Sequence, residues 1–108
     1  MEWTTMERLR IYTGEAERME GMPAYEHIVK AAHKNGLAGA TVIRGIMGYS
    51  GHSVVNTAKI LRLAENLPIL IEIIDTVDRI DAFCAMELVK LNRCLLTRDT
   101  VAVKVVRN

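Results

Sequence analysis

The chain is poor in aromatic residues and in net charge, and both shortages narrow what it can do. Of 108 residues, 1 is Trp, 3 are Tyr and 1 is Phe. Sheet proteins that bind single-stranded RNA stack the bases on aromatic side chains of their middle strands. The formal net charge is only +1, which gives no electrostatic case for binding a nucleic acid or an anionic membrane. We therefore expect no nucleic-acid partner.

The chain also has few residues suited to metal binding or covalent catalysis. Cys84 and Cys94 are the only cysteines and form no CxxC pair, so we expect two reduced, mostly buried thiols. A disulfide or a catalytic thiol is the alternative. His27 and His33 are six residues apart, which places them on different faces of one helix. Spacing alone assembles no Ser/His/Asp, Cys/His or paired-carboxylate site. The sequence therefore predicts no metal site and no enzyme.

Long apolar runs are absent as well. The longest, such as Leu67–Ile74, are far shorter than the roughly 20 residues that cross a bilayer. Met1–Thr13 carries four charged residues and lacks the apolar centre of a signal peptide. Half of the residues are hydrophobic and a quarter are charged, which is ordinary for one globular domain. We expect a single domain over residues 1–108, cytoplasmic and not inserted in a membrane.

The most distinctive segment is Thr41–Ser53, where an apolar run ends in three evenly spaced glycines, namely Gly45, Gly48 and Gly51. Glycine adopts backbone angles that a side chain forbids and lets a ligand approach the main chain. Exposed amides together with Arg44 could hold a phosphate, and Tyr49 could stack on a base. The structural alternative is a glycine-rich connection with a buried tyrosine. We expect residues 45–57 to form the most mobile loop of the protein.

Hydrophobic periodicity predicts four strands and two helices. The expected strands are Glu7–Thr13, Ala38–Arg44, Leu67–Asp75 and Asp99–Arg107. The first helix spans Ala24–Asn35, with Pro23 at its start and Gly36 closing it. Residues 14–22 read as a loop, whereas residues 53–66 fit a helix or a strand about equally well. This order is the βαββαβ, ferredoxin-like pattern of an α+β antiparallel sheet with both helices on one face.

The second helix is expected to begin at a cap formed by Asp75 or Thr76. One apolar stripe follows it, made of Val77, Ile80, Cys84, Leu88 and Leu91. Phe83 flanks this stripe.

The strands predict an oligomer, because the third and fourth are apolar on both faces although helices cover only one. The residues expected on the open face are Leu70, Ile74, Ala102 and Val106. Monomers rarely leave such a patch in water. Glu72 interrupts the third strand, and we expect it to form an ion pair with Arg10 or Lys104. A carboxylate that contacts a ligand between subunits is the alternative.

Several motifs together resemble a known family. They are Leu9-Arg-Ile-Tyr-Thr-Gly-Glu15, Ala38-Gly-Ala-Thr-Val-Ile-Arg-Gly-Ile-Met-Gly-Tyr49, Leu61-Arg-Leu63 and Leu67-Pro-Ile-Leu-Ile-Glu-Ile-Ile-Asp75. They resemble a group of uncharacterised small bacterial and archaeal proteins that are classed with the nitrogen-regulatory PII-like proteins. The resemblance implies a homotrimer of ferredoxin-like domains that binds an adenine nucleotide or a related metabolite between subunits. It also implies a long loop that regulates a transporter or an enzyme.

The resemblance also implies a set of ligand-binding residues. At the loop they are Thr41, Arg44, Gly45, Gly48, Tyr49 and Gly51, and Arg98 and Lys104 would supply further cations. PII proteins hold the ATP phosphates with a glycine- and lysine-rich turn before the last strand. The expected turn here, Leu95–Asp99, has no glycine. The sequence therefore departs from the family where its phosphates bind.

An enzyme is the alternative function. Acylphosphatases have the same strand order and bind phosphate with a basic glycine-rich loop after the first strand. Here Gly14-Glu-Ala-Glu-Arg18 occupies that place, and its acidic side chains would repel a phosphate. We therefore expect a binding and signalling module.

Overall fold

The computed structural model describes residues 2–49, 66–91 and 93–107. The expectation for Gly51 lies outside these ranges, as do residues 53–65 of the predicted 53–66 segment and most of the predicted 45–57 loop. The elements are β1 (Thr4–Gly14), β2 (Arg18–Met19), β3 (Met22–Pro23), α1 (Ala24–Lys34), β4 (Gly39–Arg44), β5 (Pro68–Asp75), α3 (Val77–Glu87), the 3-10 helix η2 (Leu88–Lys90) and β6 (Leu95–Val103).

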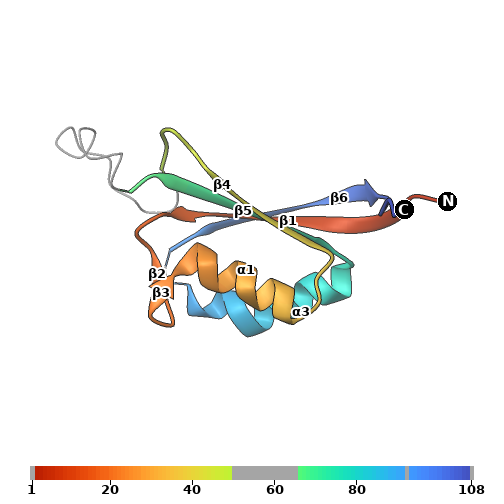
Figure 1. Cartoon of the computed structure of the whole chain (residues 1–108), viewed down its shortest axis with the longest axis horizontal. Coiled ribbons are helices and arrows are strands. Elements are labelled where there is room, and N and C mark those ends of the chain that lie inside the picture. The colour runs from red at the N-terminus through yellow and green to blue at the C-terminus, as the bar shows by residue number, and fades with distance from the viewer. Residues whose placement is uncertain (1, 50–65, 92, 108) are drawn as a thin grey trace.

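The four long strands form one antiparallel sheet in the order β4-β5-β1-β6. Both helices lie on the same side of this sheet (Figure 1). The ferredoxin-like α+β prediction is therefore confirmed. The short strands β2 and β3 pair as a separate hairpin within the predicted 14–22 loop. Neither described helix, at 11 residues each, is long and apolar enough to cross a membrane.

The predicted helix ends agree closely with the structure. Pro23 is the residue before α1, where its missing amide hydrogen leaves no helical bond unmade. Gly36 has a φ of +71°, the left-handed conformation that favours glycine after a helix. Thr76 caps α3 by accepting a hydrogen bond from the amide of Arg79.

The last strand was predicted four residues too late. It pairs with β1 from Leu95, opposite Tyr12, to Val103, opposite Thr4. The segment Leu95–Asp99 is therefore strand and not a phosphate-binding turn. The error arose because Thr97-Arg98-Asp99 is polar and looks like a turn, whereas in the structure its charges bond to side chains of β1.

The core lies between the helices and one face of the sheet. Its largest fully buried side chains are Phe83, Leu9, Ile11, Ile28, Ile71, Ile73 and Ile80. Two predictions for α3 need correction: Phe83 belongs to the core, and Val77 is 52% exposed. Val77 is the first residue of the helix, so it lies at the end of the helix layer and not over the sheet.

The strand register identifies the residues of the open face, meaning the sheet surface without helices. Leu70 and Ile74 of β5 alternate with the buried Ile69, Ile71 and Ile73 and are partly exposed, as expected. On β6 the prediction was wrong. Val101 and Val103 lie opposite Met6 and Thr4 on the open face, whereas Ala102 faces the other way and Val106 lies beyond the strand. Apolar side chains share this face with the charged Arg8, Arg10, Glu72 and Asp99, and Ile43 and Leu95 are more than half exposed.

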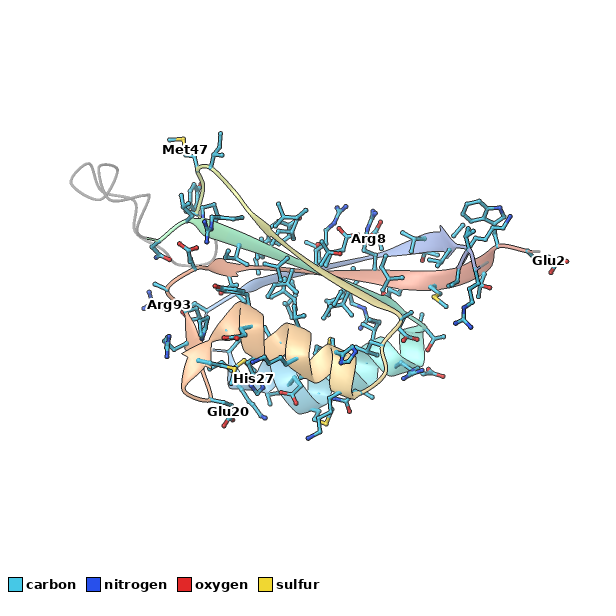
Figure 2. All side chains as sticks on the ribbon, in the orientation of Figure 1. Glu2, Arg8, Glu20, His27, Met47 and Arg93 are labelled. Carbon is cyan, nitrogen blue, oxygen red and sulfur yellow. The ribbon has the colours of Figure 1, made fainter. Side chains whose placement is uncertain are left out.

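The two helices are joined by a polar contact at the end of α3. His27 of α1, labelled in Figure 2, lies with its Nε2 3.0 Å from Oε2 of Glu87. Lys90 lies 3.4 Å from the same oxygen. The hydrogen bond from His27 is the main reason why the pKa of Glu87 is lowered. Because the Glu87 side chain is only 10% exposed, this contact shields a carboxylate inside the helix layer.

We expect Glu87→Gln to lower the free energy of unfolding by about 1 kcal/mol at pH 7, since the charge-assisted bonds are lost. A lowered native pKa stabilises the folded state above the unfolded pKa, and this contribution disappears as pH falls through the native pKa. The difference between variant and wild type should therefore shrink below about pH 4.3. Urea unfolding at several pH values measures it, with the exposed Glu26→Gln as control. A difference that does not change with pH would contradict this account.

Candidate functional site

The predicted ligand loop begins at the end of β4. Arg44 is the last residue of this edge strand and pairs with Ile69, which in turn pairs with Thr13. Directly opposite residues in an antiparallel sheet share a face. Arg44 therefore starts on the helix side of the sheet, at the end of β1 where the chain turns into Gly14 and Glu15.

Gly45 is required here by a close approach to Pro68. Its amide donates a 2.8 Å hydrogen bond to the Pro68 carbonyl. A Cβ on Gly45 would lie 2.8 Å from Cγ of Pro68, too close for any other residue unless the ring moved. The Gly45 amide is thus engaged within the chain and is not exposed toward an anion, contrary to the expectation for this glycine.

Residues 46–49 are highly exposed. Ile46 is 94% exposed and Tyr49 is 72% exposed, so the alternative with a buried tyrosine does not describe this segment. Figure 2 shows Met47 at the tip of the turn above β4. Within the described chain, no hydrogen bond engages the amides of residues 46–49. Among the described residues, the segment therefore offers unengaged amides and an accessible aromatic ring within five residues of Arg44 in the sequence.

The Arg44 guanidinium already has a partner. Its Nη2 lies 2.6 Å from Oε2 of Glu15, with the arginine side chain 60% and the glutamate side chain 21% exposed. The backbone around Glu15 is tied down: its amide donates to the Leu67 carbonyl at 2.9 Å, and the Ala16 amide donates to Oδ1 of Asn66 at 3.0 Å. Glu15 lies in the segment that was expected to be a loop. Its pairing with Arg44 could not be expected from the sequence, because only the folded strands bring the two residues together.

Arg98 has an equally complete set of partners. It lies on β6 opposite Leu9, on the helix side of the sheet. Its Nε donates to Glu7 at 2.7 Å and its Nη1 donates to Asp81 of α3 at 2.6 Å. These hydrogen bonds, from Glu7 first and Asp81 next, raise the pKa of Arg98 above its usual value. Arg98 thereby joins β1, β6 and α3.

Thr41 lies in a polar row that crosses the open face. The register places it opposite Glu72, Glu72 opposite Arg10, and Arg10 opposite Thr97. Arg10 and Glu72 approach to 3.7 Å, which confirms the expected cross-strand ion pair. Even so, the buried Nε of Arg10 has no hydrogen-bond partner among the described residues. In this part of the chain the row therefore leaves a buried donor unsatisfied.

Lys104 lies at the far end of the sheet from Arg44. Its Nζ is 5.8 Å from the ring centroid of Trp3, a cation–π contact. Val103 pairs with Thr4, whereas the row of Arg44 includes Thr13. At about 3.4 Å per residue these rows are about 30 Å apart. One chain therefore does not bring Lys104 to Arg44.

The two cysteines have the surroundings of structural thiols. Cys84 and Cys94 are free and partly buried. Burial is the main reason why the pKa of each thiol is raised, so both stay protonated at neutral pH. Across residues 2–49, 66–91 and 93–107, no three His, Cys, Asp or Glu side chains come together as a metal site would require.

Comparison with known proteins places the chain among uncharacterised proteins. The family model DUF190, described as "Uncharacterized ACR", matches residues 6–103. The UPF0166 protein of Aquifex aeolicus is 41% identical over 75 residues, covering 69% of this chain and 71% of the relative. The UPF0166 protein MJ1524 of Methanocaldococcus jannaschii is 37% identical over 93 residues, covering 84% and 85%.

Solved structures of PII-like proteins have the same fold. CPII from Thiomonas intermedia, bound to ADP and bicarbonate, matches with a TM-score of 0.66 and 12% identity over 94% of this chain and 91% of that chain. A putative PII-like signalling protein from Thermus thermophilus matches with a TM-score of 0.57 and 14% identity over 95% and 93%. At these identities the likeness shows a PII-like fold.

We expect Arg98→Ala to destabilise the protein by about 1–2 kcal/mol, because it leaves the partly buried Glu7 without its partner. Arg98→Lys should retain part of this stability, since lysine can bond to one carboxylate but not to both in the same geometry. Urea unfolding measures both variants. If Arg98→Ala were as stable as wild type, the contacts with Glu7 and Asp81 would contribute nothing to the free energy of unfolding.

Proposed function

Because the chain belongs to the DUF190 family and has the PII-like fold, we propose that it is a binding and signalling module. In this proposal it forms a homotrimer and binds an adenine nucleotide or a related polyanion in clefts between subunits. Ligand binding changes the 45–57 loop, which regulates a transporter or an enzyme. A ligand shifts a loop only by its different affinity for two loop states.

The exposed start of the loop is the observation that carries the proposal. Arg44 supplies a positive charge, residues 46–49 supply amides without partners in the described chain, and Tyr49 supplies a ring for stacking. Cations, free amides and an aromatic face are the groups that hold a nucleotide. Thr41 lies within β4 on the opposite face from Arg44, and Gly45 directly follows the strand. Gly48 is exposed within the turn that follows Gly45, and a Cβ at either glycine would approach the Pro68 ring.

The separation of the predicted site residues supports a site between subunits. Arg98 lies on β6 and Lys104 just beyond it, and β6 is at the opposite edge of the sheet from β4. A ligand at Arg44 can meet them only if a neighbouring subunit contributes them. The exposed apolar side chains of the open face, such as Ile43 and Leu95, supply a reason for such assembly, and an unsatisfied donor such as Arg10 Nε could find a partner there.

The solved relatives support the ligand class. One structure of CPII is described as bound to ADP, AMP and acetate, and another as bound to ADP and bicarbonate. The first aligns with this chain at a TM-score of 0.61 over 97% of its length. On this basis the ligand to test first is ADP.

The acylphosphatase-like alternative has less support. Such an enzyme needs free amides in the loop after β1, whereas here the amides of Glu15 and Ala16 donate to Leu67 and Asn66. The carboxylate of Glu15 also occupies this place. The binding module is therefore the better account of the same residues.

We expect the purified protein to have a mass near three times 12.1 kDa, and Ile74→Lys to dissociate it. Each large apolar side chain buried between subunits contributes about 1.5–3 kcal/mol, and a buried unpaired lysine is strongly unfavourable. Val89→Lys, at an exposed position of η2 in the helix layer, makes a similar apolar-to-lysine change and should leave the mass unchanged. Light scattering after gel filtration measures all three proteins. A monomeric wild type at micromolar concentration would contradict the trimer.

We expect Arg44→Ala to weaken ADP binding by at least about tenfold, since a hydrogen bond between charged groups contributes about 1.5–3 kcal/mol. Lys30→Ala removes the same charge from an exposed position on α1 and should bind like wild type. Isothermal titration calorimetry on the assembled protein measures both. Equal losses in the two variants would mean that net charge, and not the loop site, governs binding.

A further inference from the structure

The arginine on which the proposed site depends is occupied by a carboxylate of the same chain. Arg44 and Glu15 approach to 2.6 Å, and both flank the exposed loop start. An anion that binds Arg44 must therefore displace Glu15 or share the guanidinium with it. This inference rests on the proposed function and asks which anions can succeed.

Glu15 is the fixed member of the pair. It follows β1 directly, its amide is bonded to Leu67, and the next amide is bonded to Asn66. Its side chain is 21% exposed, against 60% for Arg44. Arg44 ends an edge strand and has a long, rotatable side chain. Release of the pair therefore moves the guanidinium outward and leaves the carboxylate in place.

We propose that Glu15 is an internal competitor that makes the site selective for polyphosphates over single carboxylate-like anions. A tethered group acts at an effective concentration of about millimolar or more. A free monoanion such as acetate offers the same charge and the same two-oxygen geometry, so it gains nothing by exchange. A di- or triphosphate brings several charges to one cation and the exposed amides, and so outcompetes Glu15.

The test compares variants of the assembled protein by calorimetric titration with inorganic pyrophosphate and, separately, with acetate. Glu15→Gln removes the competing charge, and Glu15→Asp keeps the charge but shortens the side chain by one methylene. Glu17→Gln is the matched control, since it removes one negative charge two residues away and is not in an ion pair with a described residue. Thermal unfolding of each variant verifies that it is folded.

We expect both Glu15 variants to bind pyrophosphate about two- to fivefold more tightly than wild type, the range that corresponds to a surface ion pair. Acetate binding should become detectable in Glu15→Gln. The Glu17→Gln variant should match wild type. Combining Glu15→Gln with Arg44→Ala should abolish the gain, because the competitor acts through that guanidinium.

Three results would overturn the proposal, and they have different meanings. Pyrophosphate binding could be unchanged or weaker in Glu15→Gln while Arg44→Ala still weakens it. Glu15 would then only position Arg44, and the proposed binding function would stand. Equal gains in Glu15→Gln and Glu17→Gln would reduce the effect to net charge. No binding of pyrophosphate or ADP by any variant, wild type included, would remove the anion site itself.

Discussion

The alternation of side chains along β1 is the constraint on which the rest of the structure depends. This strand pairs over most of its length with β5 on one side and β6 on the other. Leu9, Ile11 and Thr13 point into the core, whereas Arg8 and Arg10 lie on the open face. A slip of one residue would exchange these two sets. The core and the open face are therefore specified together.

Cross-strand charges add to the register that the apolar alternation specifies. Arg8 forms two hydrogen bonds to Asp99, which lies directly opposite, at 3.1 and 2.6 Å. On the other face, Arg98 bonds to Glu7 along the diagonal. The bonds from Arg8 also hold the pKa of Asp99 below its usual value. Exposed pairs contribute little stability individually. A shifted register would nevertheless separate both pairs and leave their charges without these partners.

Much of the fold could be predicted from the sequence because it depends on periodicity. The helix after Pro23, the end at Gly36 and the strand ending at Asp75 follow from local patterns and agree with the structure. The start of β6 could not be predicted in this way, because Arg98 and Asp99 look like turn residues until their partners on β1 are known. Polar strand residues are recognised only by what they contact.

The candidate site was predicted in part for the same reason. Arg44 and the exposed Tyr49 follow from a motif that is continuous in the sequence, whereas Glu15 is 29 positions from Arg44 along the chain. The engaged amide of Gly45 depends on Pro68, which is similarly remote. Local motifs locate a candidate ligand loop, whereas the residues that contact it from elsewhere in the chain are found only once the strand register is known.

Four arginines of the sheet illustrate how one cation can stay accessible while its neighbours are engaged within the fold. Arg8, Arg10 and Arg98 lie within paired rows, and the sheet holds their carboxylate partners in place. Arg44 differs because it ends an edge strand and its partner lies beyond the last paired residue of β1. The Arg44 side chain is also 60% exposed, whereas those of Arg8, Arg10 and Arg98 are 27%, 34% and 32% exposed. The position of a cation relative to the strand ends thus decides whether a ligand can reach it.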